Sequence, residues 1–379
     1  MRIVFLSHSA RLGGAELALC ELVDGLTRTG AAEAEVLLPR GGPLAEELGR
    51  AGARVGVRRS QGWATLRRSR LALPAMAALD VPSVALLAAR LMRSRPDVVV
   101  TNSLTNPCGA LAARLAGVRH LWLVNEFGDL DHGYRFLLGV PRTLAAVGRL
   151  SAGVLACSRA VAERVATHVD PRKVTFAYYA VTMPTGAPPE RGRAVRGPLR
   201  LLLLGKKHEG KGQLDAVRAL ALLLADGVDA RLRLVGDGEP AYEERVRALA
   251  TDLRAGDAVE SVAFTAEPAR EIDAADVVVM CSRAEGFGRV TVEAMRRFRP
   301  VVGARAGATT ELLEGSGGGL LYPPGDARAL ADRVASLHAD PELALRLARS
   351  GSRWAAEHCT PDGYLNAFLA LARGANASG

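Results

Sequence analysis

Three of the chain's four lysines lie close together, at Lys206, Lys207 and Lys211, whereas the other 45 of its 49 basic side chains are arginines. The segment 205–212 has the sequence Gly-Lys-Lys-His-Glu-Gly-Lys-Gly and follows a leucine-rich run that predicts a strand. Cations beside glycines at the carboxyl end of a strand suit a diphosphate. No Ser or Thr follows Lys211 to hold magnesium, so the segment is not a Walker A loop. A solvated turn is the alternative interpretation.

A second segment, 285–295, has the sequence Glu-Gly-Phe-Gly-Arg-Val-Thr-Val-Glu-Ala-Met. It follows a predicted strand at Val277–Cys281, turns at the glycines and enters a predicted helix. The backbone N–H groups near Gly288–Val290 can therefore point at an anion. Glu285 precedes the helix and Glu293 lies more than a turn inside it, so both cannot face one phosphate. They suit hydroxyl groups on either side of it, of a sugar and of a ribose; the alternative is two surface glutamates.

A third segment, 11–16, has the sequence Arg-Leu-Gly-Gly-Ala-Glu, between the first predicted strand and a helix. Paired glycines there let a phosphate or a sugar approach the backbone and the positive helix end. The segment is not Gly-x-Gly-x-x-Gly, and the second predicted strand does not end in an acidic residue. These two absences argue against a nicotinamide-dependent dehydrogenase.

The elements that must position these segments alternate between short Val/Ile/Leu-rich runs and helices along the whole chain, which predicts parallel sheets with crossover helices. A segment at Val181–Pro198 is rich in Pro, Gly and Arg and has no apolar period, so it is predicted to be a linker. We therefore expect an α/β protein of two Rossmann-like, doubly wound domains with a cleft between them. The predicted strands are Ile3–Ser7, Glu35–Leu38, Arg54–Val57, Val98–Thr101, Leu121–Val124 and Val154–Cys157 in the first half, then Leu199–Gly205, Ala230–Gly236, Val259–Phe264, Val277–Cys281, Val301–Gly303 and Leu320–Tyr322.

Composition narrows the class of protein. The net charge of +9 comes from arginines spread along the chain without interleaved aromatics, which argues against nucleic acid as a partner. The densest basic cluster, Arg58–Arg70, suits a solvated helix face or an anionic membrane surface. Five scattered cysteines without a Cys-x-x-Cys pair predict a reducing cytoplasm. The longest apolar runs, Leu71–Leu79 and Val81–Ala89, are separated by Asp80 and Pro82, so no membrane-spanning helix is expected.

The motifs together resemble glycosyltransferase family 4. The likeness rests on the segment 285–295, on Gly-Lys-x4-Lys-Gly about 80 residues earlier, and on Gly-Ala-Thr-Thr-Glu at 307–311. The segments at 13–16 and 235–238 and a predicted final helix at about Pro361–Arg373 also fit, so the likeness covers nearly the whole chain. The family contains retaining enzymes of GT-B fold. The resemblance implies an acceptor-binding domain at 1–183 completed by the helix at 360–379, and a donor-binding domain at 184–359.

The resemblance also implies roles for residues. Glu285 would contact the donor sugar, Glu293 the nucleotide ribose, and Lys206 and Lys211 the diphosphate; Lys206, Lys211 and Glu285 are the catalytic candidates. The first cation of the family motif is usually arginine, so Lys206 lacks the bidentate fork. The donor-binding candidates are Gly14, Gly205, Lys206, Lys211, Gly236, Glu285, Gly286, Phe287, Gly288, Arg289, Val290 and Glu293.

The segment 125–132, Asn-Glu-Phe-Gly-Asp-Leu-Asp-His, stands where the family often carries a histidine after a strand. Its Asp-x-Asp resembles the metal-binding signature of the other major glycosyltransferase fold, GT-A, which would not need a second Rossmann-like half. We expect these residues to line the acceptor side instead. The acceptor-side candidates are Glu16, Asn125, Glu126, Asp129, Asp131 and His132.

The expected function is therefore transfer of a sugar from a UDP- or GDP-linked donor to a small-molecule or lipid-linked acceptor, without a metal or other cofactor. No Ser-His-Asp or Cys-His order suggests an enzymatic nucleophile, so the departing diphosphate would take the acceptor's proton, as the resemblance implies. The enzyme is expected in the cytoplasm, with possible peripheral contact at the inner face of the membrane. A sugar-nucleotide epimerase or hydrolase of the same fold and a non-catalytic nucleotide-sugar-binding protein are the alternatives.

Overall fold

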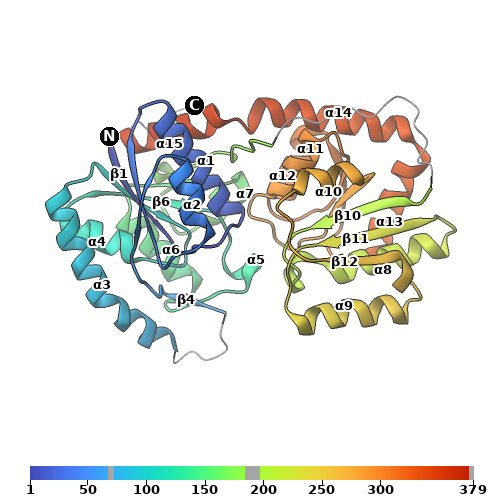
Figure 1. The fold of residues 1–379 in the computed structure, drawn as a ribbon, viewed down its shortest axis with the longest axis horizontal. Helices are drawn as coiled ribbons and strands as arrows, with labels where there is room; N and C mark the ends of the chain where they lie inside the picture. The colour runs from blue at the N-terminus through green and yellow to red at the C-terminus, as the bar shows by residue number, and fades with distance from the viewer. Residues whose placement is uncertain (67–71, 184–196, 375–379) are drawn as a thin grey trace. The chain divides into compact units, whose positions relative to one another are not determined.

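The computed structural model describes residues 1–66, 72–183 and 197–374. The chain divides into two compact units, one of Met1–Thr182 with Thr360–Gly379 and one of Met183–Cys359 (Figure 1). Most of the predicted linker, residues 184–196, lies outside the described residues, as do Arg67, Arg68 and Arg70 of the basic cluster.

The first unit is built on a parallel sheet of seven strands in the order β3-β2-β1-β5-β6-β8-β9. Its strands are β1 (Arg2–Ser7), β2 (Glu33–Leu38), β3 (Arg54–Val57), β5 (Val98–Asn102), β6 (Arg119–Val124), β8 (Gly153–Ala156) and β9 (Val174–Phe176). Strand β9 was not predicted, because its three residues are too few to show a period and all three are only half-buried. A short antiparallel pair, β4 (Ala64–Thr65) with β7 (Arg135–Phe136), was not predicted either.

Helices join these strands and cover the sheet (Figure 1). They are α1 (Gly14–Arg28), α2 (Pro43–Arg50), α3 (Ala72–Ser94), α4 (Cys108–Ala116), α5 (Asp129–His132), α6 (Gly139–Leu150) and α7 (Arg159–Ala166). Ser158 caps α7 as the sequence predicts, since its hydroxyl accepts a hydrogen bond of 3.2 Å from the Val161 N–H.

The final helix, α15 (Pro361–Arg373), belongs to the first unit although it follows the helices of the second. Phe368 stacks on Phe5 of β1 with ring centroids 5.9 Å apart, and Tyr364 meets Tyr179 edge-on at 5.6 Å. All four of these rings are buried. The predicted return of the last helix to the first domain is confirmed.

The second unit has a six-stranded parallel sheet in the order β12-β11-β10-β13-β14-β15. Its strands are β10 (Leu199–Leu204), β11 (Ala230–Val235), β12 (Val259–Val262), β13 (Val277–Met280), β14 (Val301–Ala304) and β15 (Gly319–Tyr322). Its helices are α8 (Gln213–Ala225), α9 (Pro240–Asp252), α10 (Pro268–Ala274), α11 (Arg289–Arg296), α12 (Ala308–Ser316), α13 (Ala327–Ala339) and α14 (Pro341–His358). Strand β12 ends before the predicted Phe264, whose N–H instead donates to the Asp237 side chain at 3.0 Å.

The two apolar runs that the sequence separates at Asp80 and Pro82 form one helix, α3, with Pro82 inside it. Asp80 does not interrupt it because the carboxylate is buried and accepts hydrogen bonds from the Gln61 and Gly62 N–H groups, at 2.8 and 2.7 Å. Residues Leu73–Ser94 are long and apolar enough to cross a membrane by length and composition, with 28% of the most apolar window buried. The expectation that Asp80 and Pro82 keep the two apolar runs apart was therefore wrong.

A buried histidine on β6 makes the stability of the first unit depend on pH. His120 is 3% exposed, with Nε2 2.8 Å from the Thr101 hydroxyl. Burial lowers the pKa of His120 from 6.5 to about 3. Its neutral form is therefore favoured by folding, and that stability is present above pH 6.5 and lost as the pH falls toward 3. At pH 5 the expected loss is about 2 kcal/mol.

We expect His120→Gln to flatten this acid dependence, because glutamine stays neutral and keeps a hydrogen-bonding group near Thr101. Urea unfolding at pH 7.5 and pH 5 checks it. His338→Gln, at an exposed position on α13, is the matched control and should follow the wild type. An equal loss of stability in wild type and His120→Gln would contradict the assignment.

Candidate active site

The lysine segment and the glutamate segment of the second unit meet through one ion pair. Lys211 Nζ lies 2.7 Å from Glu285 Oε2, and the Ser282 hydroxyl donates to the same oxygen at 2.8 Å. Lys211 and Glu285 keep 26% and 13% of their side-chain surface exposed. The pair is thus partly shielded from water but open to a ligand, and Ser282 is a member of the site that no sequence motif indicated.

A close backbone contact between the loop after β10 and the end of β13 fixes the position of Lys211. Gly212, directly after Lys211, has φ of +71°, and a Cβ there would lie 2.3 Å from the Cys281 carbonyl oxygen. The Arg283 N–H also donates to the Gly210 carbonyl at 3.1 Å. The loop after β10 is therefore held against the end of β13, which brings Lys211 to Glu285.

The two adjacent lysines of the same loop have opposite environments. Lys207 is 3% exposed, and its ammonium lies 3.0 Å from Glu243 and 2.8 Å from Ser261. Lys206 is exposed, and its carbonyl accepts a hydrogen bond from Gln213. Lys207 is thus a buried structural cation, whereas Lys206 can reach a ligand.

The glutamate segment turns into α11 at Gly288, which has φ of +82° and stands at the N-cap. Gly286, Phe287 and Gly288 are buried, and Val290 is half-buried. Glu293, one turn into the helix, pairs with Arg289 at 3.0 Å, and both side chains are largely buried. Arg289 therefore orients Glu293 beside the first turn of α11, whose N–H groups favour an anion.

Two glycines shape the neighbouring strand ends. Gly205 follows β10 and Gly236 follows β11, and both have positive φ, +150° and +138°. A Cβ on Gly236 would lie 2.3 Å from the Gly205 carbonyl oxygen. The backbone after β10 therefore lies too close to Gly236 for a side chain at that position.

In the first unit, Gly14 begins α1 and Glu16 lies in its first turn. Glu16 is 6% exposed, and its Oε1 lies 3.6 Å from His8 Nδ1. Burial raises the pKa of Glu16, and the charge of His8 partly opposes the shift.

Asn125 and Glu126 follow β6 and tie it to the end of β5. The Asn125 side chain bonds Asn102 at 2.5 Å and accepts from the Tyr179 hydroxyl at 2.6 Å. Glu126, which is buried, accepts hydrogen bonds from the Ser103 hydroxyl and the Leu104 N–H, at 2.5 and 2.7 Å. Ser103 and Tyr179 lie in no recognised motif, although the φ of +94° at Ser103 marks a strained position.

The two aspartates of Asp-x-Asp have separate local partners. Asp131 accepts from the Phe127 and Gly128 N–H groups at 2.9 and 2.8 Å, and Asp129 pairs with Arg164 at 3.1 Å. Burial raises the pKa of Asp131, which the neighbouring His132 opposes and Glu126 reinforces. In residues 1–66, 72–183 and 197–374, no group of three His, Cys, Asp or Glu side chains is arranged to hold a metal.

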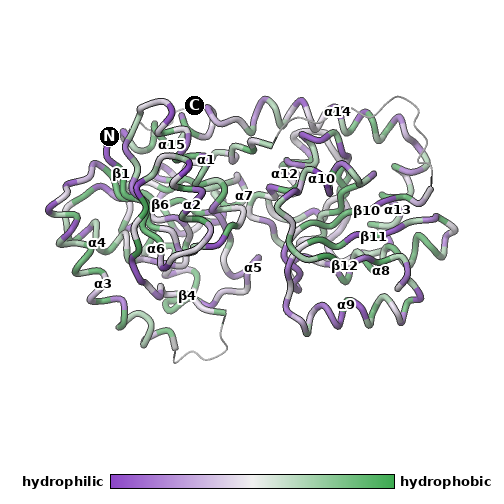
Figure 2. Tube along the Cα trace, in the orientation of Figure 1, coloured by the Kyte–Doolittle hydropathy of each residue, from purple (hydrophilic) through white to green (hydrophobic). Residues whose placement is uncertain are grey.

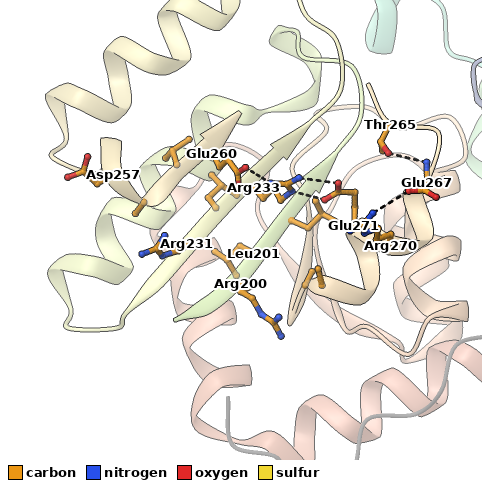
Figure 3. A pocket seen from close by; sticks show the side chains of 16 residues that line it. Arg200, Leu201, Arg231, Arg233, Asp257, Glu260, Thr265, Glu267, Arg270 and Glu271 are labelled. Carbon is orange, nitrogen blue, oxygen red and sulfur yellow. Dashed lines mark hydrogen bonds and ion pairs between the residues drawn. The ribbon is translucent and has the colours of Figure 1, made fainter. Parts of the chain in front are cut away.

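A hollow of about 850 Å³ also lies in the second unit, along the first half of β10, β11 and β12 (Figure 3). Arg233 at its centre pairs with Glu260 and Glu271, at 2.5 and 2.6 Å. None of the donor-binding candidates lines it. Ligands of α/β sheets bind at the carboxyl ends of the strands, so this hollow is not the candidate site.

Family models match both parts of the chain. Residues 12–183 match the model described as Glycosyltransferase Family 4, and residues 198–340 match Glycosyl transferases group 1. A D-inositol 3-phosphate glycosyltransferase of Pseudarthrobacter chlorophenolicus is 30% identical over 249 residues, 63% of this chain and 58% of that one. An N-acetyl-alpha-D-glucosaminyl L-malate synthase of Bacillus anthracis is 33% identical over 34% of this chain and 33% of its own length. The chain thus matches about three fifths of the length of the first relative and one third of the second.

Solved structures match over nearly the full length. Anabaena HepE in complex with UDP-glucose has a TM-score of 0.81 at 22% identity, covering 99% of this chain and 100% of that one. Sucrose-phosphate synthase from Thermosynechococcus elongatus has a TM-score of 0.77 at 19% identity, covering 99% and 98%. With two parallel-sheet units and both family models matched, this chain belongs to glycosyltransferase family 4 and has the GT-B fold.

Proposed function

We propose that the chain transfers a sugar from a nucleoside-diphosphate sugar to an acceptor hydroxyl with retention of anomeric configuration and without a metal. The observation that carries the proposal is the Lys211–Glu285 pair, held at 2.7 Å between the ends of β10 and β13. It places a cation and a carboxylate side by side, as a diphosphate next to a sugar would require. HepE, solved with UDP-glucose, has the same fold, which supports UDP as the nucleotide; GDP remains the alternative.

The charged residues of the second unit would bind different parts of the nucleotide sugar. Lys206 and Lys211 would neutralise the diphosphate, assisted by the N–H groups of Gly288, Arg289 and Val290 at the start of α11. Glu285 would accept hydrogen bonds from the sugar hydroxyls, and its contact with Lys211 aligns the sugar with the phosphate. Glu293, oriented by Arg289, would bind the ribose hydroxyls. The glycines at 205 and 236 would let the nucleotide approach the backbone.

The bond changes need no enzymatic nucleophile. The bond between the anomeric carbon and the diphosphate oxygen breaks, the acceptor oxygen bonds the anomeric carbon on the same face, and its proton passes to the departing diphosphate. The protein then contributes orientation and preorganised positive charge.

The acceptor candidates lie in the first unit. Glu16 and His132 are the ones we favour for contact with acceptor hydroxyls. Glu126 and Asp131 are already engaged with backbone N–H groups and would act by holding the loops that follow β5 and β6. A small-molecule or lipid-linked acceptor in the cytoplasm, and a peripheral membrane contact through Arg58–Arg70, remain predictions.

The stereochemistry of the product tests the proposal. An α-linked UDP- or GDP-sugar is expected to give an α-linked product, identified from the anomeric proton coupling by NMR, and the rate should be unchanged by EDTA. A β-linked product would mean inversion and a general base such as Glu126, Asp129, Asp131 or His132. Loss of activity in EDTA with rescue by manganese would make the two aspartates metal ligands. Turnover of donor without acceptor would indicate the epimerase or hydrolase alternative.

A further inference from the structure

The outer face of α3 is apolar and uncharged over most of its length. From Leu73 to Ala89 the helix carries one charged residue, Asp80, and its carboxylate is buried. The large side chains that face solvent are strongly exposed: Leu79 by 69%, Val81 by 65% and Leu86 by 62%. Figure 2 shows α3 as largely hydrophobic along a helix at the edge of its unit.

The side of α3 that packs into the core is a different one. The opposite side of α3 supplies Val84, Leu87, Ala88 and Leu91 to a core cluster with strands β1 and β5. Asp80 also faces inward, toward the Gln61 and Gly62 N–H groups and, at 3.3 Å, the Cys108 thiol. The helix therefore has one packed side and one apolar side that the unit leaves open, and contiguous exposed apolar surface marks an interaction site.

Arginines border the apolar face. At mid-helix, the Ser83 hydroxyl donates to the Arg59 carbonyl at 2.7 Å, and Arg58 donates to the Ser83 carbonyl at 2.6 Å. At the end of the helix, Arg93 follows Leu79 and Leu86 at intervals of seven residues, so these three lie on one stripe. Arg59 and Arg93 are exposed, and neither is ion-paired within the described part of the chain. The adjacent helix α4 also exposes Leu111, Arg114 and Leu115.

We propose that α3 binds an anionic lipid surface, lying along it with Leu79 and Leu86 in the boundary between headgroups and acyl chains. Apolar side chains flanked by cations are the features of an interfacial helix. The helix lies on the bilayer and does not cross it, because crossing would remove Val84, Leu87 and Leu91 from the core and expose Asp80 to lipid. The proposal does not depend on the glycosyl-transfer chemistry proposed above.

The test is co-sedimentation of the full chain with vesicles of phosphatidylglycerol or of phosphatidylcholine. The wild type should bind the anionic vesicles more tightly, and salt should weaken that binding. The double variant Leu79→Ser/Leu86→Ser should bind them by roughly 10-fold or more less tightly, since two exposed leucines lose their burial in lipid. Arg93→Glu should reduce binding by about 5-fold or more and lower the preference for anionic lipid.

Matched controls lie in the second unit. Leu253→Ser follows α9 at a residue 39% exposed, and Arg349→Glu lies on an exposed position of α14; both should bind as the wild type does. Circular dichroism and thermal melting establish that each variant is folded, and Arg93→Glu serves alone if the double variant is not. Wild-type binding by the double variant or by Arg93→Glu, or no binding by the wild type, overturns the proposal. A concentration-dependent dimer that Leu79→Ser/Leu86→Ser abolishes, without vesicle binding, would assign the face to a second copy of the chain instead.

Discussion

Lys211→Ala is expected to lower kcat by on the order of 100-fold or more, the effect of removing one preorganised donor that stabilises charge in the transition state. The negative charge on the leaving diphosphate grows as its bond to the sugar breaks, so the loss should appear mainly in kcat. The same substitution leaves Glu285 with Ser282 as its hydrogen-bond partner, which keeps the loop near its native position. Initial rates over a range of donor concentrations measure kcat and KM separately.

Arg245→Ala is the matched control for that loss of charge. Arg245 is exposed and pairs at 2.9 Å with Glu209, in the same loop as Lys211. An exposed pair contributes at most about 1 kcal/mol, so activity should stay within about 5-fold of the wild type. Wild-type turnover by Lys211→Ala would remove the lysine from the catalytic site, and equal losses in both variants would point to a general effect of charge.

The second large effect is expected at Gly212. Gly212→Ala puts a methyl group 2.3 Å from the Cys281 carbonyl oxygen at a position with φ of +71°. Because the atoms it would meet are the carbonyl group and Cβ of Cys281, which cannot turn aside as the end of a flexible side chain can, the loop after β10 must move away from the end of β13. We expect the free energy of unfolding to fall by roughly 2–5 kcal/mol, the sum of left-handed strain and overpacking. Urea unfolding measures this loss, and nucleotide binding should weaken as Lys211 moves from Glu285.

Gly227→Ala separates the cost of left-handed strain from the cost of overpacking against Cys281. Gly227 also has positive φ, +80°, but a Cβ there meets nothing within 4 Å. Its replacement should cost only the conformational strain, about 1–2 kcal/mol, and leave nucleotide binding unchanged. If Gly212→Ala proves no worse than Gly227→Ala, the backbone contact with Cys281 does not hold the site.

The positions of the segments 205–212 and 285–295 in the fold could be predicted from the sequence, because they depend on the strands that these segments directly follow. Glycines and charged residues that follow a strand must lie at its carboxyl end, so the placement of Lys211 and Glu285 near one sheet edge follows from the order of elements. The family motif selects Lys206 over Lys207, but the burial of Lys207 could not be predicted, since it depends on Glu243 and Ser261, which lie on other elements. Ser282 was missed for the same reason: a serine after a strand has no distinctive pattern.

Other features depend on tertiary contacts that the sequence does not encode locally. From the sequence, Asp80 was expected to interrupt an apolar run. In the structure α3 is continuous, because the Gln61 and Gly62 N–H groups donate hydrogen bonds to the Asp80 carboxylate. Glu126 and Asp131 are charged residues in a segment whose sequence suggests exposure, yet Glu126 is buried, Asp131 is half-buried, and both accept hydrogen bonds from backbone N–H groups that only the folded loops provide. Strand β9 exists because β8 offers a partner, and its three residues alone carry no signal.

The return of α15 to the first unit has a consequence for synthesis on the ribosome. The side chains that pack against Phe5 and α1, among them Leu365 and Phe368, are made only after the whole of the second unit. Residues 183–359 must be translated first, which at 5–20 residues per second takes on the order of ten seconds or more. During that time the first unit has every strand of its sheet but lacks α15, and by the time α15 is made the second unit has its whole sequence. The unit whose synthesis begins first is therefore completed after the other, and until α15 is made its apolar surface around β1 and α1 is open to aggregation.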